Sequence, residues 1–423
     1  MERAKLIVKN FGPLKDIEIE IREMATFIGS QASGKSTLAK LISIFEDEGF
    51  RRDNSISFEG ELKKYNIYSY LNENTFIEYS AGIIVKKAYG FIFKFVYKNN
   101  KSLKFDFRDK TKKDIIEAFL NENKVDDPKL IEKFELLFTI DSLLTNKDLT
   151  SAKIFNFFKD TLADPITTED FESFFNIYEE ILFEKSGISV IYDSIYIPSE
   201  RNFLHLIAEN TLGLINNNVQ IPKHLLNSGQ EYEKALQTIK ELPLNIIDKK
   251  IKYKREGKTS YIYHNDHEKV NLLESASGLQ SVIPILLLVE YSKSLKEKYN
   301  FNFVVEEPEL NLYPKAQHEL IKYLVKNCLF DRKNLILTTH SPFVLASINN
   351  LLLAYDKGQK FPKEVNKIIK KDSWLNPKNF IAYELKNGKA KKIMNDKLGQ
   401  ISENMIDGVS DAFANEFDKL LDL

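Results

Sequence analysis

The segment Gly29-Ser30-Gln31-Ala32-Ser33-Gly34-Lys35-Ser36-Thr37 satisfies the pattern G-x-x-x-x-G-K-[ST]. The apolar residues 24–28 before it predict a strand, and residues 37–45 after it have the spacing of a helix. In this context the glycines let the backbone N–H groups surround phosphate oxygens, and the helix adds its positive end. Lys35 neutralises phosphate charge, and Ser36 reaches Mg²⁺. We therefore expect Gly29 to Thr37 to bind ATP with Mg²⁺, a chance match in a loop being the alternative.

Two further apolar stretches end in residues that suit phosphate chemistry. The first is Phe303-Val304-Val305-Glu306-Glu307-Pro308-Glu309, and the second is Leu335-Ile336-Leu337-Thr338-Thr339-His340-Ser341-Pro342. An acidic pair at the end of a buried strand can hold a metal with its first member and orient a water molecule with its second. Acidic residues also end strands as solubilising caps, and a lone histidine is often structural. Here His340 follows a second buried strand, which favours a functional role.

A third segment, Ser275-Ala276-Ser277-Gly278-Leu279-Gln280, opens a predicted helix between these motifs and the nucleotide loop. A Ser-Gly pair at a helix start can bind an anion through backbone N–H groups. Without context the same residues are an ordinary helix N-cap. Their place in the order of motifs favours the anion-binding interpretation.

This order of motifs resembles the ABC-type ATPases. Within them it resembles the overcoming-lysogenisation-defect-like (OLD-like) branch of the SMC-like AAA family, which includes relatives of the chromosome-maintenance and break-repair ATPases. The opening Val8-Lys9-Asn10-Phe11-Gly12-Pro13 also looks like the first strand and turn of that branch. The resemblance covers residues 5–41 and about 193–345. It implies an α/β fold of the ABC-type P-loop class, with a mixed central sheet, an antiparallel β subdomain and a helical insertion.

The resemblance also implies roles for single residues. Glu306 and Ser36 would hold the metal, Glu307 would be the catalytic base, and His340 would sense the γ-phosphate. Lys35 would contribute to catalysis as well as to binding. Ser277, Gly278 and Gln280 would form a signature that contacts the nucleotide of the opposing subunit, so the family dimerises. Residues 310–312 occupy the place of the loop that crosses this interface.

Two departures and one uncertain segment qualify the resemblance. Gln31 stands where the branch usually has Asn, and Glu306 stands where most ABC ATPases have Asp. The first matters little because backbone groups bind the phosphates, whereas the second leaves the metal geometry open. Glu200 and Arg201 resemble a recurring segment of the branch, and a salt bridge at a strand end explains them equally well.

Composition and charge bound the remaining possibilities. The chain has 60 Lys and Arg residues against 61 Asp and Glu, so any nucleic-acid surface must be a local patch. Cys328 is the single cysteine, which excludes an intrachain disulfide. The sequence has no apolar signal core and no membrane-length apolar run, so we expect a cytoplasmic protein without membrane contact.

We expect one ATPase domain over residues 1–423. Its parts are the N-terminal strands and nucleotide loop (1–45), an antiparallel β region (46–112), the helical insertion (113–187), a lobe with the signature, the acidic pair and the histidine (188–349), and a C-terminal α/β extension (350–423). Residues 401–423 have an amphipathic helical pattern that predicts either a cover for the core, which we favour, or a docking surface.

Lys250, Lys252 and Lys254 alternate along a predicted strand of a hairpin that turns at Gly257. On one face of a sheet they would contact DNA phosphates. A solvated sheet face is the more common explanation for such lysines.

The function expected from these features is hydrolysis of ATP to ADP and phosphate at composite dimer sites. The ATPase would act, as a homodimer or a higher homo-oligomer, as a nucleotide-dependent switch on DNA or on a separately encoded effector. The effector expected is a nuclease in anti-phage defence. The alternatives are an ATP-binding scaffold or sensor with little turnover and, less favoured, a transporter ATPase subunit. A toprim nuclease domain, which many relatives carry, needs an Asp-x-Asp pair, and no such pair follows His340. We therefore expect the stand-alone ATPase form.

Overall fold

The structure, a computed structural model, describes residues 2–53, 55–85, 88–106, 191–208, 221–265, 267–295, 299–329 and 334–421. The chain divides into two compact units: Met1–Arg3, Ser80–Phe95 and Leu103–Ser189 form one, and Ala4–Tyr79, Val96–Ser102 and Val190–Leu423 form the other. All residues of the expected site belong to the second unit. The predicted helical insertion, residues 113–187, lies outside the described residues, and the predicted division of the chain into parts stays a prediction.

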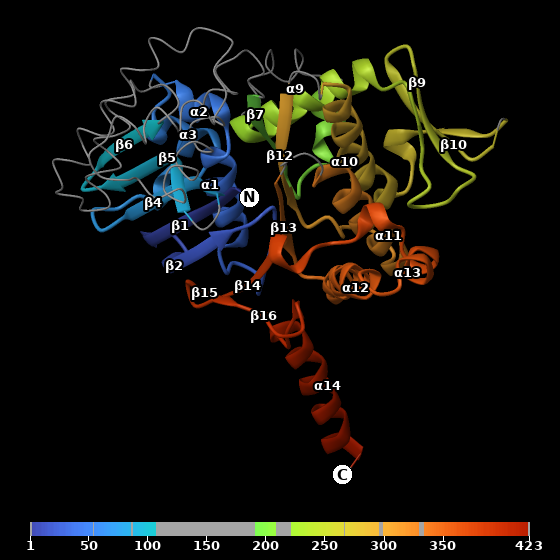
Figure 1. Ribbon diagram of the computed structural model, residues 1–423. Helices are drawn as coiled ribbons and strands as arrows, with labels where there is room; N and C mark the ends of the chain where they lie inside the picture. Colours follow the sequence, from blue (N-terminus) through green and yellow to red (C-terminus); the bar gives the residue numbers. More distant parts are fainter. Residues whose placement is uncertain are drawn as a thin grey trace, which may run out of the picture. The chain divides into compact units, whose positions relative to one another are not determined.

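Strands and helices alternate from residue 277 to residue 358, and elsewhere in the described chain they mostly come in runs of one kind (Figure 1). The strands are β1 (Glu2–Phe11), β2 (Leu14–Ile21), β3 (Met24–Gly29), β4 (Phe76–Val85), β5 (Ala88–Lys98), β6 (Lys101–Asp106), β7 (Ile191–Ile197), β8 (Glu241–Pro243), β9 (Lys252–Glu256), β10 (Thr259–Tyr263), β11 (Lys269–Asn271), β12 (Tyr299–Glu306), β13 (Leu335–Thr339), β14 (Phe380–Lys386), β15 (Lys389–Lys392), β16 (Met394–Asn395) and β17 (Gln400–Ile401). The helices are α1 (Lys35–Phe45), α2 (Glu48–Arg52), α3 (Phe58–Lys64), α9 (Lys223–Thr238), α10 (Ser277–Ser294), α11 (Pro314–Cys328), α12 (Pro342–Gly358), α13 (Pro362–Ile368) and α14 (Met405–Leu421).

A mixed sheet organises the fold, and within the described residues its strand order is β6-β5-β4-β1-β2-β15-β14-β3-β13-β12-β7. β1 and β2 pair antiparallel, whereas β14, β3, β13, β12 and β7 form a parallel core. Every residue of β3 and β13 is buried, as expected for central parallel strands covered on both faces. The carboxyl ends of β3, β12 and β13 therefore meet at one edge of the sheet, and each of the three is followed by a predicted motif.

Helices cover the two faces of this parallel core. α1 contacts β3, β7, β12 and β13 on one face. On the other face Phe303 and Val305 join a hydrophobic core with residues of α10, α11 and α12, and Figure 1 shows these helices on the far side of β12 from α1. Because neighbouring residues of a strand point to opposite faces, Val304 lies on the side of α1. The nucleotide loop and the predicted signature thus start helices on opposite faces of the sheet.

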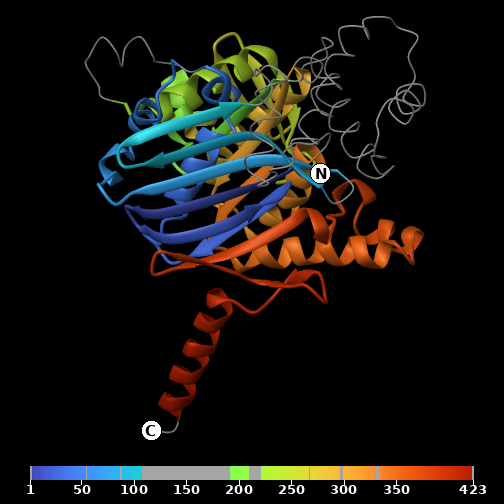
Figure 2. The same cartoon turned by 60° about the vertical axis from the view of Figure 1, so that its left-hand side comes forward.

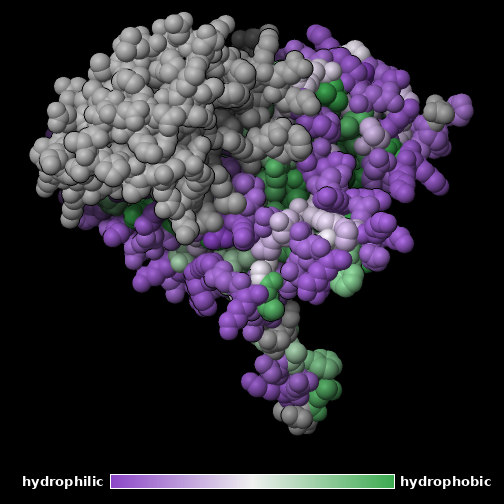
Figure 3. All heavy atoms as spheres, viewed as in Figure 1, coloured by the Kyte–Doolittle hydropathy of each residue, from purple (hydrophilic) through white to green (hydrophobic). Residues whose placement is uncertain are grey.

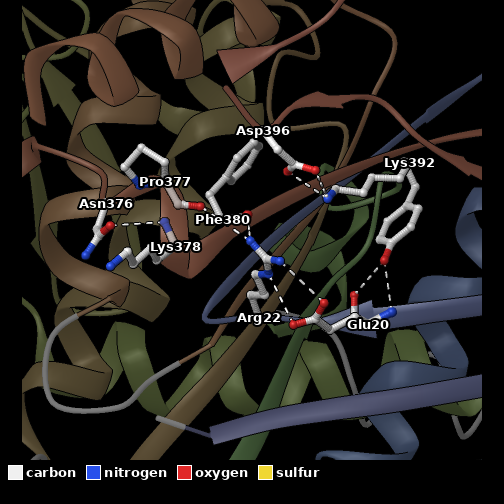
Figure 4. A network of polar contacts seen from close by, with 9 residues as sticks. Glu20, Arg22, Asn376, Pro377, Lys378, Phe380, Lys392 and Asp396 are labelled. Carbon is white, nitrogen blue, oxygen red and sulfur yellow. Dashed lines mark hydrogen bonds and ion pairs between the residues drawn. The ribbon is translucent and has the colours of Figure 1, made fainter. Parts of the chain in front are cut away.

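The segment predicted as a C-terminal extension supplies a strand to the middle of the sheet. β14 lies parallel to β3 with Phe380 opposite Met24, and Figure 2 shows these red strands beside the blue N-terminal ones. Arg22 fixes the start of β14, since its guanidinium donates to the carbonyl oxygen of Phe380 at 3.1 Å and pairs with Glu20 at 3.2 Å (Figure 4). The hydroxyl of Tyr383 in β14 accepts a hydrogen bond from the Glu20 backbone N–H at 2.9 Å.

A small antiparallel sheet of order β11-β10-β9-β8 precedes α10, and the predicted hairpin turn at Gly257 is confirmed by its φ of +58°. Lys252 and Lys254 share one face of β9, as predicted, but Lys250 precedes the strand and does not belong to that face. Its neighbour Asp248 accepts the Lys250 backbone N–H, which makes a turn there. Lys252 pairs with Glu241 at 3.2 Å.

The C-terminal tail forms a helix, as predicted, but the favoured expectation that its apolar stripe covers the core is wrong. Figures 1 and 2 show α14 leading away from the sheet, and Figure 3 shows apolar side chains gathered on one side of it. Phe413 is 67% exposed and Phe417 is 63% exposed, whereas Met405 and Ile406 at the start of the helix pack against the core. Among the described helices, none is both long and apolar enough to span a bilayer.

Candidate functional site

The nucleotide loop connects β3 to α1, as predicted. Gly34 has a φ of +99°, and Ala32 also has a positive φ. The φ of Gly34 requires glycine, and an added Cβ on Gly34 would also lie 2.6 Å from a side-chain carbon of Leu14, which would have to move. A Cβ on Gly29 would lie 2.6 Å from the carbonyl oxygen of Leu385 in β14. The loop is therefore fitted closely to the strands beside it.

Lys35 is buried in the concave side of this loop. Its ammonium group donates hydrogen bonds to the carbonyl oxygens of Gly29 and Ser30, each at 3.0 Å. Burial lowers the pKa of Lys35, and the carboxylates of Glu307, Glu309 and Glu306 oppose this shift. The folded chain thus brings the lysine of the first motif into the field of all three glutamates at the end of β12.

Glu306 ends β12 and is 2% exposed. Burial raises the pKa of its carboxyl group, and Lys40 and the hydroxyls of Tyr196 and Ser36 oppose this effect. Within the described residues its Oε1 atom has no hydrogen-bond partner. A buried carboxylate with an unused oxygen beside a serine hydroxyl fits Mg²⁺, which proteins hold with one or two oxygen ligands while phosphates and water supply the others. Ser36 and Glu306 therefore suit the metal role that the resemblance implies.

Glu307 has a φ of +42°, which is an unfavourable backbone conformation for a residue with a side chain. Its backbone N–H donates to the carbonyl oxygen of Thr338 in β13 at 2.9 Å. Its Oε1 atom lies 3.4 Å from Nε2 of His340, and the two side chains are 26% and 36% exposed. Two of the predicted catalytic side chains are therefore adjacent and accessible from the surface.

His340 is held in place by Glu309, to which the sequence patterns gave no role. Oε1 of Glu309 accepts hydrogen bonds from the His340 backbone N–H at 2.8 Å and from the Thr339 hydroxyl at 2.7 Å. Burial raises the pKa of Glu309, and these two hydrogen bonds oppose the shift. Burial lowers the pKa of His340, with Lys35 acting in the same direction and Glu307 against it. In the sequence, the only signal for this role of Glu309 is that it is the third acidic residue of Glu-Glu-Pro-Glu.

Arg201 follows β7, and the interpretation of this residue as a salt bridge at a strand end is wrong. Its side chain is fully buried, and its guanidinium group donates to four backbone carbonyl oxygens. The acceptors and distances are Pro198 (3.3 Å), Ser281 (2.9 Å), Glu306 (2.8 Å) and Glu307 (2.8 Å). Burial lowers the pKa of Arg201 to about 10. No sequence pattern indicates these acceptors because they come from three segments far apart in the chain.

The predicted signature begins α10, where Ser277 is exposed. A Cβ on Gly278 would lie 2.6 Å from the carbonyl oxygen of Asn311, so the signature fits closely against the loop that follows β12. The amide of Gln280 instead donates to the carbonyl oxygens of Leu273 and Ser275, and it fixes the turn before the helix. Gln280 therefore supports the start of the helix, Gly278 packs it against the loop, and Ser277 is exposed there.

Three comparisons with known proteins bear on this arrangement. The AAA ATPase domain family matches residues 1–345. A comparison with curated proteins gave no match. Among solved structures, the chain is similar to an Smc head domain from Pyrococcus furiosus bound to the C-terminal domain of ScpA, with 12% identity, 93% of this chain and 96% of that chain covered and a TM-score of 0.39.

Two other solved structures are similar to the chain. For the SMC head domain from Thermotoga maritima the identity is 11%, the coverage is 93% of this chain and 98% of that chain, and the TM-score is 0.38. For the ADP conformation of an ATP-binding cassette of an ABC transporter the identity is 11%, the coverage is 94% and 93%, and the TM-score is 0.33.

The motif geometry and the mixed sheet together define a P-loop protein of the ATP-binding class, and they confirm the predicted α/β fold class. The chain belongs to the AAA ATPase domain family. The OLD-like branch, the composite dimer sites and the roles of single residues stay predictions.

Proposed function

We propose that the protein hydrolyses ATP to ADP and phosphate at two composite sites of a homodimer. Each site would combine the nucleotide loop, Glu306, Glu307 and His340 of one subunit with the Ser277-Gly278 signature of the other. One observation is the main support for the proposal. The carboxyl ends of three parallel strands bring Lys35, Glu307 and His340 together. An exposed signature that starts a helix on the opposite face of the sheet supports its use by a second subunit.

The side chains divide the chemistry between them. Lys35 and the backbone N–H groups of residues 29–37 would bind and neutralise the β- and γ-phosphates. Glu307 would orient the attacking water and accept its proton, and His340, beside it, would contact the γ-phosphate. Glu306 and Ser36 would hold Mg²⁺, which, when bound, neutralises negative charge on the phosphate oxygens. Pro308 and the positive φ of Glu307 turn the chain directly after the base, so that the carboxylate faces His340.

The surface around the signature supports the proposed dimer. Tyr313, which is 78% exposed, follows the loop that Gly278 contacts, and Phe343, 49% exposed, lies three residues after His340. Tyr313 lies seven residues after the end of β12, and Phe343 lies four residues after the end of β13. Exposed aromatic side chains around a polar site are typical of interfaces between subunits.

The variant Glu307→Gln tests the proposed activity. It keeps the size of the side chain and removes the base, so we expect turnover to fall by a factor on the order of 10²–10⁴. ATP binding should stay intact, and the ATP-bound dimer should accumulate because it no longer decays by hydrolysis. Turnover by phosphate release and dimerisation by light scattering with ATP give the two readouts.

Glu319→Gln is the matched control, because Glu319 lies on the surface of α11 and pairs with Lys322. This variant should leave both readouts unchanged. Undiminished hydrolysis in Glu307→Gln would show that Glu307 is not the base. Wild-type protein that binds ATP without turnover would favour the scaffold alternative instead.

We further propose that this ATPase is a nucleotide-dependent switch for a separately encoded effector, namely a nuclease in anti-phage defence, or for DNA itself. Residues 341–423 contain no Asp-x-Asp pair of the kind that a toprim nuclease site needs, and we therefore place any nuclease activity on a separate effector. Lys252 and Lys254, on the outer face of β9, are the proposed DNA contacts, and Lys250 beside the strand would join them only through its loop. Purified protein should not cut plasmid DNA with Mg²⁺ or Mn²⁺, and cutting should require a co-purified partner. Cleavage by the protein alone, removed by a mutation outside the ATP site, would contradict this proposal.

A further inference from the structure

The signature helix α10 contains a proline, Pro284, which removes one backbone hydrogen bond from the first turns of the helix. Pro284 has no N–H group, so the carbonyl oxygen of Gln280 lacks the donor that an uninterrupted helix would provide. Burial of a carbonyl group without a hydrogen-bond partner destabilises the fold. The chain must therefore supply a donor from elsewhere.

His205, a buried residue that follows β7, meets this requirement, and the buried Arg201 adds a second contact to the same turn. Nε2 of His205 lies 2.8 Å from the Gln280 carbonyl oxygen, and Nε of Arg201 donates to the next carbonyl oxygen, that of Ser281, at 2.9 Å. Because a carbonyl only accepts, Nε2 of His205 carries the proton. Its Nδ1 atom therefore accepts from the Tyr232 hydroxyl at 2.9 Å. Side-chain hydrogen bonds from Arg201 and His205 thus hold the first turns of α10 in place.

The other end of the same guanidinium group holds the catalytic segment. Arg201 donates through Nη1 to the carbonyl oxygen of Glu306 and through Nη2 to that of Glu307, both at 2.8 Å. Glu307 is the residue with the unfavourable φ of +42°, a conformation that persists only where surrounding contacts fix it. The Arg201 hydrogen bond to its carbonyl and the Thr338 hydrogen bond to its N–H fix it from both sides.

We infer that Arg201 is a positioning residue that links the signature helix of each subunit to the Glu307 backbone of the same subunit. This inference rests on the proposed composite sites. A subunit's signature would contact the nucleotide in its partner's site, whereas its Glu307 acts in its own site. One rigid, planar guanidinium group with fixed donors would then transmit a movement of the signature to the catalytic base, and so would connect the two sites of the dimer.

Mixed dimers test the link directly. One subunit carries Glu307→Gln, so hydrolysis occurs only where the wild-type subunit's Glu307 meets the signature of the mutant subunit. Arg201→Lys is then added to the Glu307→Gln subunit, where Arg201 holds that signature but does not touch the working base. We expect kcat to fall about 10-fold, with KM for ATP changed less than about 3-fold, because the signature is displaced and the nucleotide loop is not. Unchanged kcat would overturn the inference.

Hydrogen exchange of the nucleotide-free protein gives a readout that does not depend on hydrolysis. Arg201→Lys, which keeps the charge and is the mildest change, should speed amide exchange in residues 277–284 and residues 306–310 together. Faster exchange in only one of the two segments would overturn the link. If wild-type protein neither hydrolysed ATP nor dimerised, the proposed function would fail, and this exchange result would still decide whether Arg201 joins the two segments.

Arg51→Lys is the matched control for folding. Arg51 is also buried and donates to the Phe45 carbonyl oxygen and to the carboxylate of Glu46 at 3.1 Å. It should lower the melting temperature without the paired exchange increase in residues 277–284 and 306–310. The same pattern in both variants would indicate general destabilisation and would overturn the inference.

Discussion

The nucleotide loop and the surroundings of Glu307 serve one site but are built in different ways. In the loop, Lys35 binds the carbonyl oxygens of residues only five and six positions earlier, and the required glycines lie within the same motif. Around Glu307, the contacts come from Arg201, 106 residues earlier, and from Thr338, 31 residues later. A loop built from its own backbone can be recognised in the sequence, whereas a catalytic residue fixed by distant segments cannot.

The largest effect is expected in the nucleotide loop, whose contacts are local in the sequence. Lys35→Ala removes the buried ammonium group that faces three glutamates, so we expect ATP binding to weaken at least about 100-fold. Titration with a fluorescent ATP analogue measures this change. Lys5→Ala is the control, since Lys5 is an exposed member of a surface ion pair with Glu18. Equal affinity in Lys35→Ala and wild type would show that the loop does not bind through its lysine.

A smaller effect is expected in the distant contacts around Glu307. Glu309→Ala leaves the His340 backbone N–H and the Thr339 hydroxyl without their shared acceptor. We expect kcat to fall about 10-fold, since losing the two hydrogen bonds should weaken the positioning of His340 by about 1–2 kcal/mol, while ATP affinity should stay within a factor of about 3. Steady-state kinetics separates the change in kcat from the change in ATP affinity. A loss of ATP binding that equals the loss of kcat would mean that the two regions are not independent.

Gly278→Ala is expected to have a moderate effect of the same kind. Its new Cβ would meet the Asn311 carbonyl oxygen at 2.6 Å, so the signature and the loop after β12 must separate. We expect turnover to fall about 5-fold with little change in stability, because both segments lie at the surface. Gly408→Ala in α14 is the control, since a Cβ there meets nothing within 4 Å. Wild-type turnover in Gly278→Ala would show that this close fit is not needed.

The smallest effect is expected in α14. Because Phe413 and Phe417 are exposed, Phe413→Ser and Phe417→Ser should each change the free energy of unfolding by less than about 0.5 kcal/mol. Leu288→Ala in the buried helix α10 should cost about 2–5 kcal/mol and is the comparison. Urea unfolding measures both. A large loss in the α14 variants would mean that this stripe is covered in solution.

The same contrast explains how far the sequence could be interpreted. Motifs at strand ends, such as residues 303–309, were placed correctly because alternation and apolar runs are local signals. The position of β14 next to β3 was not predicted, because strand pairing across more than three hundred residues leaves no local pattern. The amphipathic pattern of α14 predicted a helix but not what its apolar side contacts. The role of Arg201 depends on backbone carbonyl groups. Every residue has one, so no residue type in the sequence marks the acceptors.

Mixing Lys35→Ala with Ser277→Arg tests the shared sites most directly. Lys35→Ala damages its own site, and Ser277→Arg, which should leave ATP binding intact, damages the partner's site. Each parent should therefore be inactive, whereas one intact site assembles in every mixed dimer. After random exchange of subunits we predict about a quarter of wild-type turnover, since about half of the dimers are mixed and each has one working site. Mixtures as inactive as both parents would contradict a site shared between subunits.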